Sequence, residues 1–481
     1  MNIGSLPRRH GRYRADHPGF ICETTRLGFG EFDRRTGRLA AAFQRRGAGR
    51  GDRIATVLPN GTAIYETYWA AARIGAATVP LSTLLRADAL NTLIADAGPA
   101  LVLADAGELE DWIAAEPPDA APVEPEMGAD DLFNIMYSSG TTGTPKGIAL
   151  TYGIRAGYCT LFASTWRMTP ESVVLHAGSM VFNGAFVTMM PAMYLGATFV
   201  LLRQFDPELL MRTIEGERVT HIMMVPSQIV ALLNAPGFDP RRLASLQMLG
   251  SVGAPLHREH RDRLIDSLPG RGYELYGLTE GFITILDRDD FSRKRDAVGV
   301  PLVFSDMRIV AENGVDPAPG QVGEIVGRSP LLTPGYYGRP DLTAQAIVDG
   351  WLFTGDLGFV DDEGFLHLVD RQKDMIISGA VNVYPRDIEE VIVSHPAVKE
   401  AAVFGVPHDR WGEVPMAAVI LRDGGAATAE SLTDWINERV GAKYQRVSAV
   451  TIVDDFPRST AGKTLKRVLR EPYWAGRSVH I

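Results

Sequence analysis

The first two thirds of this chain repeat one unit, in which a short apolar strand passes through a glycine or proline turn into an amphipathic helix. The unit is clear where "THIMMVP" leads into "SQIVALL", and again where "LQMLGSV" leads past "GAPL" into "HREHRDRLIDSL". Consecutive parallel strands need a long crossover between them, and a helix usually supplies it. The repeat therefore predicts an α/β fold with largely parallel sheets.

The pattern changes after about residue 320, where "GEIVGRSP", "WLFTGDLGFV" and "FLHLVDR" read as short strands and "DDEG" as a hairpin turn. A compact α+β pattern then follows "DRQKDMIISG". We predict a large N-terminal domain of layered α/β subdomains plus a β-rich part at 1–369 and a small α+β C-terminal domain at 374–481, with the boundary between them at 370–373. The stretch from Glu108 to Asp130, rich in alanine, proline and acid, is expected to be a surface linker.

The composition argues against several classes of protein. The formal net charge is −10 and no basic block stands out, so we expect no nucleic-acid partner. The two cysteines, Cys22 and Cys159, lie far apart, which argues against a disulfide framework or zinc site and fits a reducing compartment. The basic N-terminal stretch has no apolar run after it, so it does not read as a signal peptide. We therefore predict a cytoplasmic protein.

One segment, from Ser172 to Leu202, carries no charged residue and is long enough to span a bilayer. Asn183, Gly184 and Pro191 interrupt it. We therefore expect a buried loop, a buried helix and a strand here, and no membrane span.

The stretch "YSSGTTGTPKG", from Tyr137 to Gly147, cannot build a helix or pack a core. Its glycines let the backbone approach a ligand closely, its hydroxyls donate hydrogen bonds and Lys146 adds a positive charge. These properties predict a phosphate-binding loop, with a flexible linker as the weaker alternative. The spacing does not fit the Walker loop, and the "GKT" at 462–464 fails as well because Pro457 stands in the first glycine's place.

Five motifs, taken in order, resemble those of the AMP-forming adenylating superfamily, which includes acyl-CoA synthetases, amino-acid adenylation domains and beetle luciferases. After the phosphate loop come "YGLTE", "WLFTGD", "DRQKDMIISGAVNVYPRDIEE" and "PRSTAGKTLKRVLR". The resemblance covers essentially the whole chain. It implies an acid–thiol ligase that converts a carboxylic acid and ATP to acyl-AMP and pyrophosphate and then passes the acyl group to coenzyme A.

The resemblance also implies roles for single residues. Lys463 would reach the carboxylate and α-phosphate, Thr279 would contact the α-phosphate, and Glu280 would hold Mg²⁺. Lys373 would be the hinge residue, since this family rotates its C-terminal domain between the two steps. The residues implied to bind ATP or coenzyme A are Ser138, Thr141, Thr142, Lys146, Gly253, Ala254, Pro255, Tyr276, Asp356, Arg371, Gly379 and Ala380.

Within that set, Tyr276 would stack on the adenine, and Asp356 with Arg371 would bind the ribose hydroxyls. Taken alone, each of these residues has a plain structural explanation: a core aromatic, a turn aspartate or a surface ion pair. The ordered motifs favour the functional explanation. Ala380 replaces a glycine that the family usually has beside the thiol channel, which predicts a narrower channel.

By family position, one set of small and apolar residues lines the acyl site. A charged group would be unpaired there, so we predict a substrate that is neutral beyond its reacting carboxylate: an aryl, arylpropenoic or medium-chain fatty acid. The lining residues are Phe182, Asn183, Gly184, Ser227, Gly250 and Gly253.

Several alternatives stay open at this stage. The acyl acceptor could be a carrier protein or another molecule instead of coenzyme A, and a luciferase shares the adenylation step. A non-catalytic nucleotide-binding protein is a second alternative, against which the complete Lys463 motif argues. The oligomeric state is also open, with a homodimer as one alternative.

Overall fold

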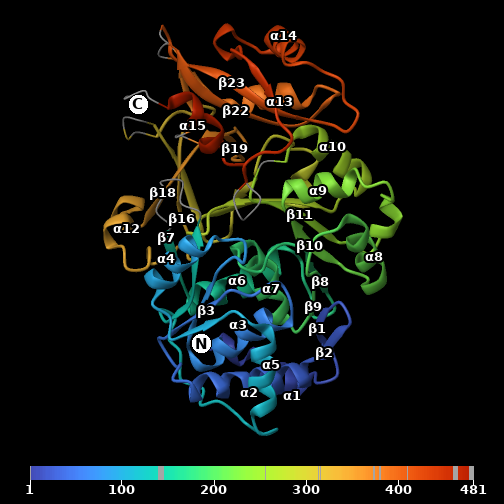
Figure 1. Cartoon of the computed structure of the whole chain (residues 1–481), viewed down its shortest axis with the longest axis vertical. Coiled ribbons are helices and arrows are strands. Elements are labelled where there is room, and N and C mark those ends of the chain that lie inside the picture. The colour runs from blue at the N-terminus through green and yellow to red at the C-terminus, as the bar shows by residue number, and fades with distance from the viewer. Residues whose placement is uncertain are drawn as a thin grey trace.

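The computed structural model describes residues 2–138, 146–254, 256–311, 314, 316–371, 374–378, 381–408, 410–458 and 464–475, with only the backbone at 138 and 371. These described residues form four sheets with helices packed on them. The N-terminal elements gather at one end of the long axis, and the elements after residue 374 gather at the other end (Figure 1).

The largest sheet has nine strands, and its middle strands are parallel. Strands β13, β14 and β2 pair antiparallel at its two edges. In order across the sheet, the strands are β14 (Val300–Pro301), β13 (Ile283–Leu286), β12 (Gly272–Gly277), β11 (Met248–Val252), β10 (His221–Met224), β8 (Val173–His176), β9 (Thr198–Leu201), β1 (Pro18–Cys22) and β2 (Thr25–Gly28).

A second sheet of five strands is parallel except for its last strand, which closes an antiparallel hairpin. Its strands, in order, are β5 (Leu101–Leu103), β3 (Arg53–Thr56), β4 (Ala77–Pro80), β6 (Leu132–Ser138) and β7 (Lys146–Thr151). The helices that accompany these two sheets are α1 (Leu6–Tyr13), α2 (Phe29–Arg45), α3 (Thr62–Ile74), α4 (Ala87–Ala97), α5 (Ala106–Ala115), α6 (Tyr152–Thr165), α7 (Asn183–Leu195), α8 (Pro207–Glu217), α9 (Pro226–Leu233), α10 (Arg258–Ser267) and α11 (Arg288–Phe291).

The third sheet is antiparallel and forms the predicted β-rich part. Its strands are β15 (Asp306–Val310), β16 (Gly323–Arg328), β18 (Trp351–Val360), β17 (Ile347–Val348) and β19 (Leu366–Arg371), accompanied by α12 (Pro340–Ala346). The turn at Asp361–Gly364 joins β18 to β19, as the "DDEG" hairpin predicts.

The fourth sheet belongs to the C-terminal part. Its strands are β21 (Val381–Val383), β20 (Ile376–Ser378), β23 (Gly412–Leu421), β22 (Val398–His408) and β24 (Val450–Ile452), accompanied by α13 (Pro385–Val393), α14 (Ala429–Arg439) and α15 (Lys466–Trp474). The apolar clusters on this sheet contain only residues from 376 onward, and none of the clusters formed by the described residues joins the two sides of 370–374. This separation is what the proposed hinge requires.

The main core lies between the first two sheets. Aromatic side chains dominate it, with Tyr65 stacked 4.5 Å from Phe20 and Trp166 stacked 5.5 Å from Phe162 between ring centroids. The predicted α/β class, with layered N-terminal subdomains, a β-rich part and an α+β C-terminal unit, is confirmed.

The prediction of a linker from Glu108 to Asp130 was wrong in its first part, because α5 extends to Ala115. Leu109 and Ile113 lie on one face of this helix and are buried, and Asp105 caps its N-terminus. Apolar residues at helical spacing therefore outweigh the acidic composition. The uncharged segment from Ser172 to Leu202 forms β8, a loop, α7 and β9, and among the described residues no helix is long and apolar enough to cross a membrane.

Candidate active site

Several of the predicted site residues lie in the segments that follow the parallel strands of the large sheet. Strands β8, β10, β11 and β12 run in one direction, so the segments after them emerge on the same side. These segments contain Phe182, Ser227, Gly253 and Thr279. Crevices at the carboxyl ends of parallel strands are the usual ligand sites of α/β folds.

The predicted phosphate loop connects β6 to β7 as the end of a hairpin. Ser138 lies opposite Lys146 in the antiparallel register, so the two ends of the loop are fixed side by side. The loop itself, residues 139–145 with Thr141 and Thr142, lies outside the described residues.

Lys146, Tyr336 and Glu280 form a row beside this hairpin. The Lys146 ammonium lies 5.1 Å from the centre of the Tyr336 ring, and the Tyr336 hydroxyl donates to Glu280 Oε1 at 2.9 Å. Burial and the Glu280 carboxylate raise the pKa of Tyr336 well above its usual value, so the phenol stays a neutral donor. The row links the proposed phosphate lysine to the proposed magnesium ligand.

Tyr336 was not predicted as a site residue, because its role depends on contacts with residues that are distant in the sequence. Residues 333–337 run along β7: Tyr337 N–H donates to Gly147 O at 2.7 Å, and Ala149 N–H donates to Gly335 O at 3.1 Å. Thr333 N–H also donates to Glu280 O at 2.7 Å. Gly281 permits this approach, since a Cβ there would lie 1.9 Å from Leu331 O. The sequence does show a Pro-Gly turn before two tyrosines, but such a turn does not reveal which distant residues contact Tyr336.

Replacing Tyr336 by phenylalanine should lower kcat/KM for ATP about tenfold, because Glu280 loses a donor that orients its carboxylate while Lys146 keeps its aromatic neighbour. Steady-state kinetics with varied ATP measure this change. Tyr337→Phe, at the adjacent position, is the matched control and should be near neutral. Equal effects of the two variants would contradict a specific role for the Tyr336 hydroxyl.

Tyr276 and Asp356, assigned to the adenine and the ribose, are in direct contact. The Tyr276 hydroxyl donates to Asp356 Oδ2 at 2.8 Å, although β12 and β18 belong to different sheets. Asp356 is 7% exposed and lies opposite Arg371 in the β18–β19 register. The side chain of Arg371 lies outside the described part of the structure.

The turn after β11 is open. Gly253 has φ of +90°, and a Cβ added there would touch only Val225, at 3.7 Å. Gly253 and Ala254 are exposed, whereas Pro255 is not among the described residues. An exposed flat turn next to Tyr276 is suited to pack on an adenine face.

The start of α7 carries the proposed acyl-site residues Phe182, Asn183 and Gly184, all partly exposed. The preceding loop is held by Asn60, which donates to Gly178 O and accepts from Met180 N–H at 2.9 Å. A Cβ at Gly184 would meet nothing within 4 Å, so this position borders open space.

Gly250, one of the predicted lining residues, does not border open space. A Cβ there would lie 2.6 Å from the Met223 side chain and 2.8 Å from Met248, so methionine side chains already fill this side. Ser227 is exposed at the start of α9. The space at the proposed acyl site therefore lies toward Gly184 and Gly253.

One charged residue near this site was missed. The sequence-based pocket held no lysine or arginine, yet the buried Arg155 of α6 donates from Nη1 to Asn183 Oδ1 at 2.9 Å. A lone arginine in the sequence of a helix gives no sign that it points inward, because charged residues are usually exposed.

The chain matches the AMP-binding enzyme family over residues 7–337 and the AMP-binding enzyme C-terminal domain over 387–463. This chain belongs to the AMP-binding enzyme family. It is similar to feruloyl-CoA synthase from an Amycolatopsis species, with 35% identity covering 98% of this chain and 99% of the relative. Long-chain-fatty-acid–CoA ligase FadD13 from Mycobacterium tuberculosis is 32% identical, with the same coverage.

The fold of this AMP-binding enzyme is close to that of MatB from Rhodopseudomonas palustris. ATP-bound MatB has a TM-score of 0.89 at 30% identity, covering 99% of each chain, whereas apo MatB has a TM-score of 0.78 at the same identity. By this measure the fold of the present enzyme is more similar to the ATP-bound MatB structure than to the apo structure. The predictions of an adenylating enzyme and of an acid–thiol ligase of the acyl-CoA synthetase type are confirmed by these similarities.

The AMP-binding enzyme has polar contacts between its N-terminal and C-terminal parts. His257, just before α10, lies 2.9 Å (Nδ1) from Glu390 Oε1 of α13, and Arg422 pairs with Glu259 at 3.3 Å. Lys463, Lys373, Gly379 and Ala380 lie outside the described residues, so their predicted roles stay predictions.

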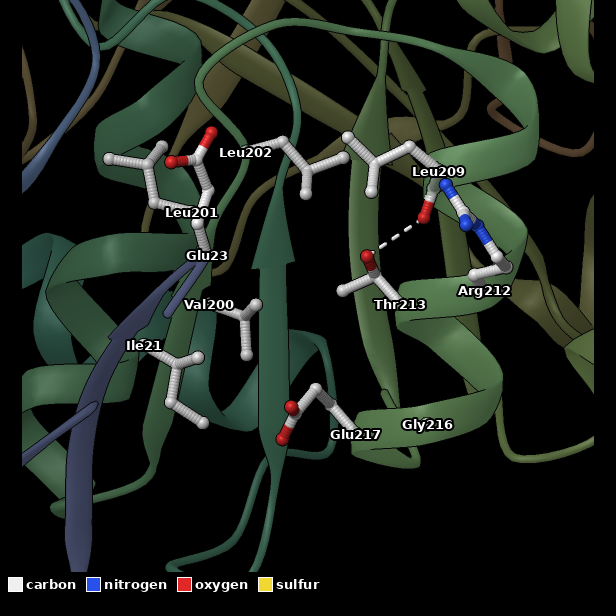
Figure 2. Close-up of a pocket in the computed structure, with 10 residues that line it drawn as sticks. All are labelled: Ile21, Glu23, Val200, Leu201, Leu202, Leu209, Arg212, Thr213, Gly216 and Glu217. Atoms are coloured by element: carbon white, nitrogen blue, oxygen red, sulfur yellow. Dashed lines mark hydrogen bonds between the residues drawn. The ribbon is translucent and has the colours of Figure 1, made fainter. Parts of the chain in front are cut away.

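A groove between the β1 and β9 strands and α8 is separate from the site just described (Figure 2). It has a volume of about 340 Å³, and none of the predicted site residues lines it. Its lining residues are Ile21, Glu23, Val200, Leu201, Leu202, Leu209, Arg212, Thr213, Gly216 and Glu217.

Proposed function

We propose that this enzyme activates an aryl, arylpropenoic or medium-chain fatty acid with ATP and Mg²⁺ and transfers the acyl group to coenzyme A. The observation that carries the proposal is that residues from distant motifs form two groups of contacting side chains, one including Tyr276 at the end of β12 and the other including Glu280 just after it. Lys146, Tyr336 and Glu280 form one group, and Tyr276 with Asp356 forms the other. The first suits a triphosphate, and the second suits a nucleoside.

The residues present fit a magnesium ion shared with a nucleotide. Among the described residues no cluster of three or more acidic, histidine or cysteine side chains could hold a metal alone. Mg²⁺ commonly takes one or two carboxylates and completes its shell with phosphate oxygens and water. Glu280 supplies such a carboxylate, and the bound ion would neutralise phosphate charge.

In the first step a carboxylate oxygen attacks the α-phosphorus and the bond to the bridging oxygen of pyrophosphate breaks. Two anions must meet, so positive charge and hydrogen-bond donors determine the rate. Lys146 would hold the β- and γ-phosphates, Thr279 and Lys463 the α-phosphate. In the second step the sulfur of coenzyme A attacks the acyl carbonyl carbon and AMP leaves.

The apolar walls of the proposed acyl site support an aromatic or medium-length acyl group. Phe182 and Val252 pack on the main core, and Gly184 borders open space. Acetate would leave most of this apolar surface uncovered, so it should be a poor substrate.

The substrate class is tested by kcat/KM for acyl-CoA formation across acetate, hexanoate, decanoate, benzoate, cinnamate, succinate and several amino acids. We expect cinnamate, benzoate or a medium-chain acid to exceed acetate by at least about a hundredfold, since each buried methylene contributes about 0.8 kcal/mol. A best substrate among acetate, succinate or the amino acids would contradict the proposed pocket.

The His257–Glu390 pair predicts a pH effect on the rotation between the two steps. Burial lowers the pKa of His257, but the Glu390 carboxylate outweighs burial and the net pKa is raised. The pair is therefore fully formed at low pH and weakens as pH rises through the raised pKa of His257. Raising the pH should favour rotation away from the domain arrangement that this ion pair stabilises. The rate of thioester formation relative to adenylation should rise by about two- to fivefold.

The measurement is the ratio of the thioester-forming rate to the adenylation rate between pH 6 and 8.5, about the range over which a histidine and a thiol titrate. In assays of His257→Gln the coenzyme A thiol still titrates, but the side chain at position 257 does not. The ratio of the two rates should therefore change less with pH in this variant than in the native enzyme. Superimposable curves for the two proteins would rule out a part for this ion pair.

A further inference from the structure

Arg155 places a buried guanidinium directly behind the proposed acyl site. The residue is 0% exposed, its Nε donates to Asn134 Oδ1 at 3.0 Å, and its Nη1 donates to Asn183 Oδ1 at 2.9 Å. Its central carbon lies 4.1 Å from the centre of the Phe186 ring. Burial lowers the pKa of Arg155 to about 10, so it remains charged at neutral pH. No carboxylate of the described residues forms an ion pair with it, which is unusual for a buried cation.

The polar cluster around Arg155 has more donors than acceptors. The oxygens of Asn134 and Asn183 both accept from Arg155, and the Tyr158 hydroxyl accepts from Asn183 Nδ2 at 3.0 Å. Arg155 Nη2 and Asn134 Nδ2 are buried and have no partner among the described residues. Buried donors without acceptors are rare because they are costly, so the cluster lacks an acceptor.

The same contacts fix how Asn183 is turned. A guanidinium has donors only, so the side chain of Asn183 must present its oxygen to Arg155 and its nitrogen to the other side. That nitrogen carries two hydrogens, and the contact with Tyr158 uses one. Asn183 is partly exposed and adjoins Gly184, where a Cβ would meet nothing within 4 Å. The amide therefore offers a donor next to open space.

We propose that Arg155 is a positioning residue that holds Asn183 with its N–H toward the acyl group, so that the site selects acids bearing an acceptor oxygen remote from the reacting carboxylate. This rests on the proposed function and narrows its substrate class. The oxygen belongs to a hydroxyl, ether or carbonyl group, since all three accept hydrogen bonds from an amide. The acids predicted from the sequence alone included plain hydrocarbon chains, which this arrangement disfavours.

The test compares ring-substituted cinnamates that differ in one atom: methoxy against ethyl, and hydroxyl against methyl, each at ring positions 3 and 4. In the native enzyme kcat/KM for the oxygenated acid should exceed that for its hydrocarbon partner by about tenfold at one position or more. Asn183→Leu and Arg155→Met should reduce this ratio to about one, and Arg155→Lys should keep part of it.

A purely structural role would lower kcat/KM for both members of a pair alike, so the ratio separates the two roles. Arg73→Met is the matched control: Arg73 is also buried but pairs with Asp33 and Glu124, and its loss should leave the ratio unchanged. Asn183→Leu keeps the test decisive if Arg155→Met does not fold. Two results would overturn this inference alone: pyrophosphate release that does not depend on the substituent oxygen, or a ratio of oxygenated to hydrocarbon acid that is unchanged in Asn183→Leu. Either result is expected if only water bonds to the polar cluster around Arg155. No pyrophosphate release with any acid would overturn the proposed function as well.

Discussion

Replacing Lys463 by alanine should abolish acyl-AMP formation while leaving thioester formation from supplied acyl-AMP largely intact. Only the first step brings the substrate carboxylate to the α-phosphate, so only that step needs the extra positive charge. The expected loss in the adenylation rate is roughly two to four orders of magnitude. Acid-dependent exchange of pyrophosphate into ATP measures the first step, and acyl-CoA formed from synthetic acyl-AMP measures the second.

Lys399→Ala is the control for this experiment, because Lys399 is an exposed lysine on β22 of the same C-terminal part. It should leave both half-reactions unchanged. If both half-reactions fell equally in Lys463→Ala, the role assigned to Lys463 would be wrong.

Asp356→Ala should lower kcat/KM for ATP by about 10²- to 10⁴-fold. The Asp356 carboxylate is proposed to accept hydrogen bonds from both ribose hydroxyls, so the variant loses two charge-assisted hydrogen bonds of about 1.5–3 kcal/mol each. The variant also removes the Asp356 carboxylate that accepts from the Tyr276 hydroxyl, so the proposed adenine site should loosen together with the proposed ribose site. Binding of AMP, followed by calorimetry, should weaken in parallel with the kinetics.

Asp362→Ala is the matched control, since Asp362 is exposed in the turn that follows β18. It should bind AMP as the native enzyme does. An Asp356→Ala variant with native AMP affinity would show that the ribose is held elsewhere.

The sequence predicted those elements whose pattern is local. Strands β10 and β11 and helices α9 and α10 follow from apolar runs, turn residues and helical periodicity, all read within a few residues. Helix α5 was missed because its acidic composition hid an apolar face that the rest of the fold buries. Amino-acid composition is an average over a whole segment, whereas the burial of a helix depends on the residues of one face.

The residues of the proposed site also divide into those with a local sequence pattern and those without one. Lys146, Glu280, Tyr276 and Asp356 were chosen from their motifs. In the structure Tyr336 contacts both Lys146 and Glu280, and Tyr276 contacts Asp356. Neither Tyr336 nor Arg155 was found, because their meaning lies in partners that the fold supplies. Tyr336 bonds to a residue 56 positions away in the chain, and Arg155 to one 28 positions away. No local pattern encodes such pairings.

This enzyme makes acyl-AMP before it makes a thioester. The direct measurement is a single turnover with excess enzyme, ATP, Mg²⁺ and a methoxycinnamate, analysed by mass spectrometry before and after addition of coenzyme A. The account predicts acyl-AMP and pyrophosphate in equal amounts when coenzyme A is absent, and conversion of acyl-AMP to acyl-CoA and AMP once it is added. ADP and phosphate in place of AMP and pyrophosphate, or a thioester formed without any acyl-AMP before it, would contradict the account.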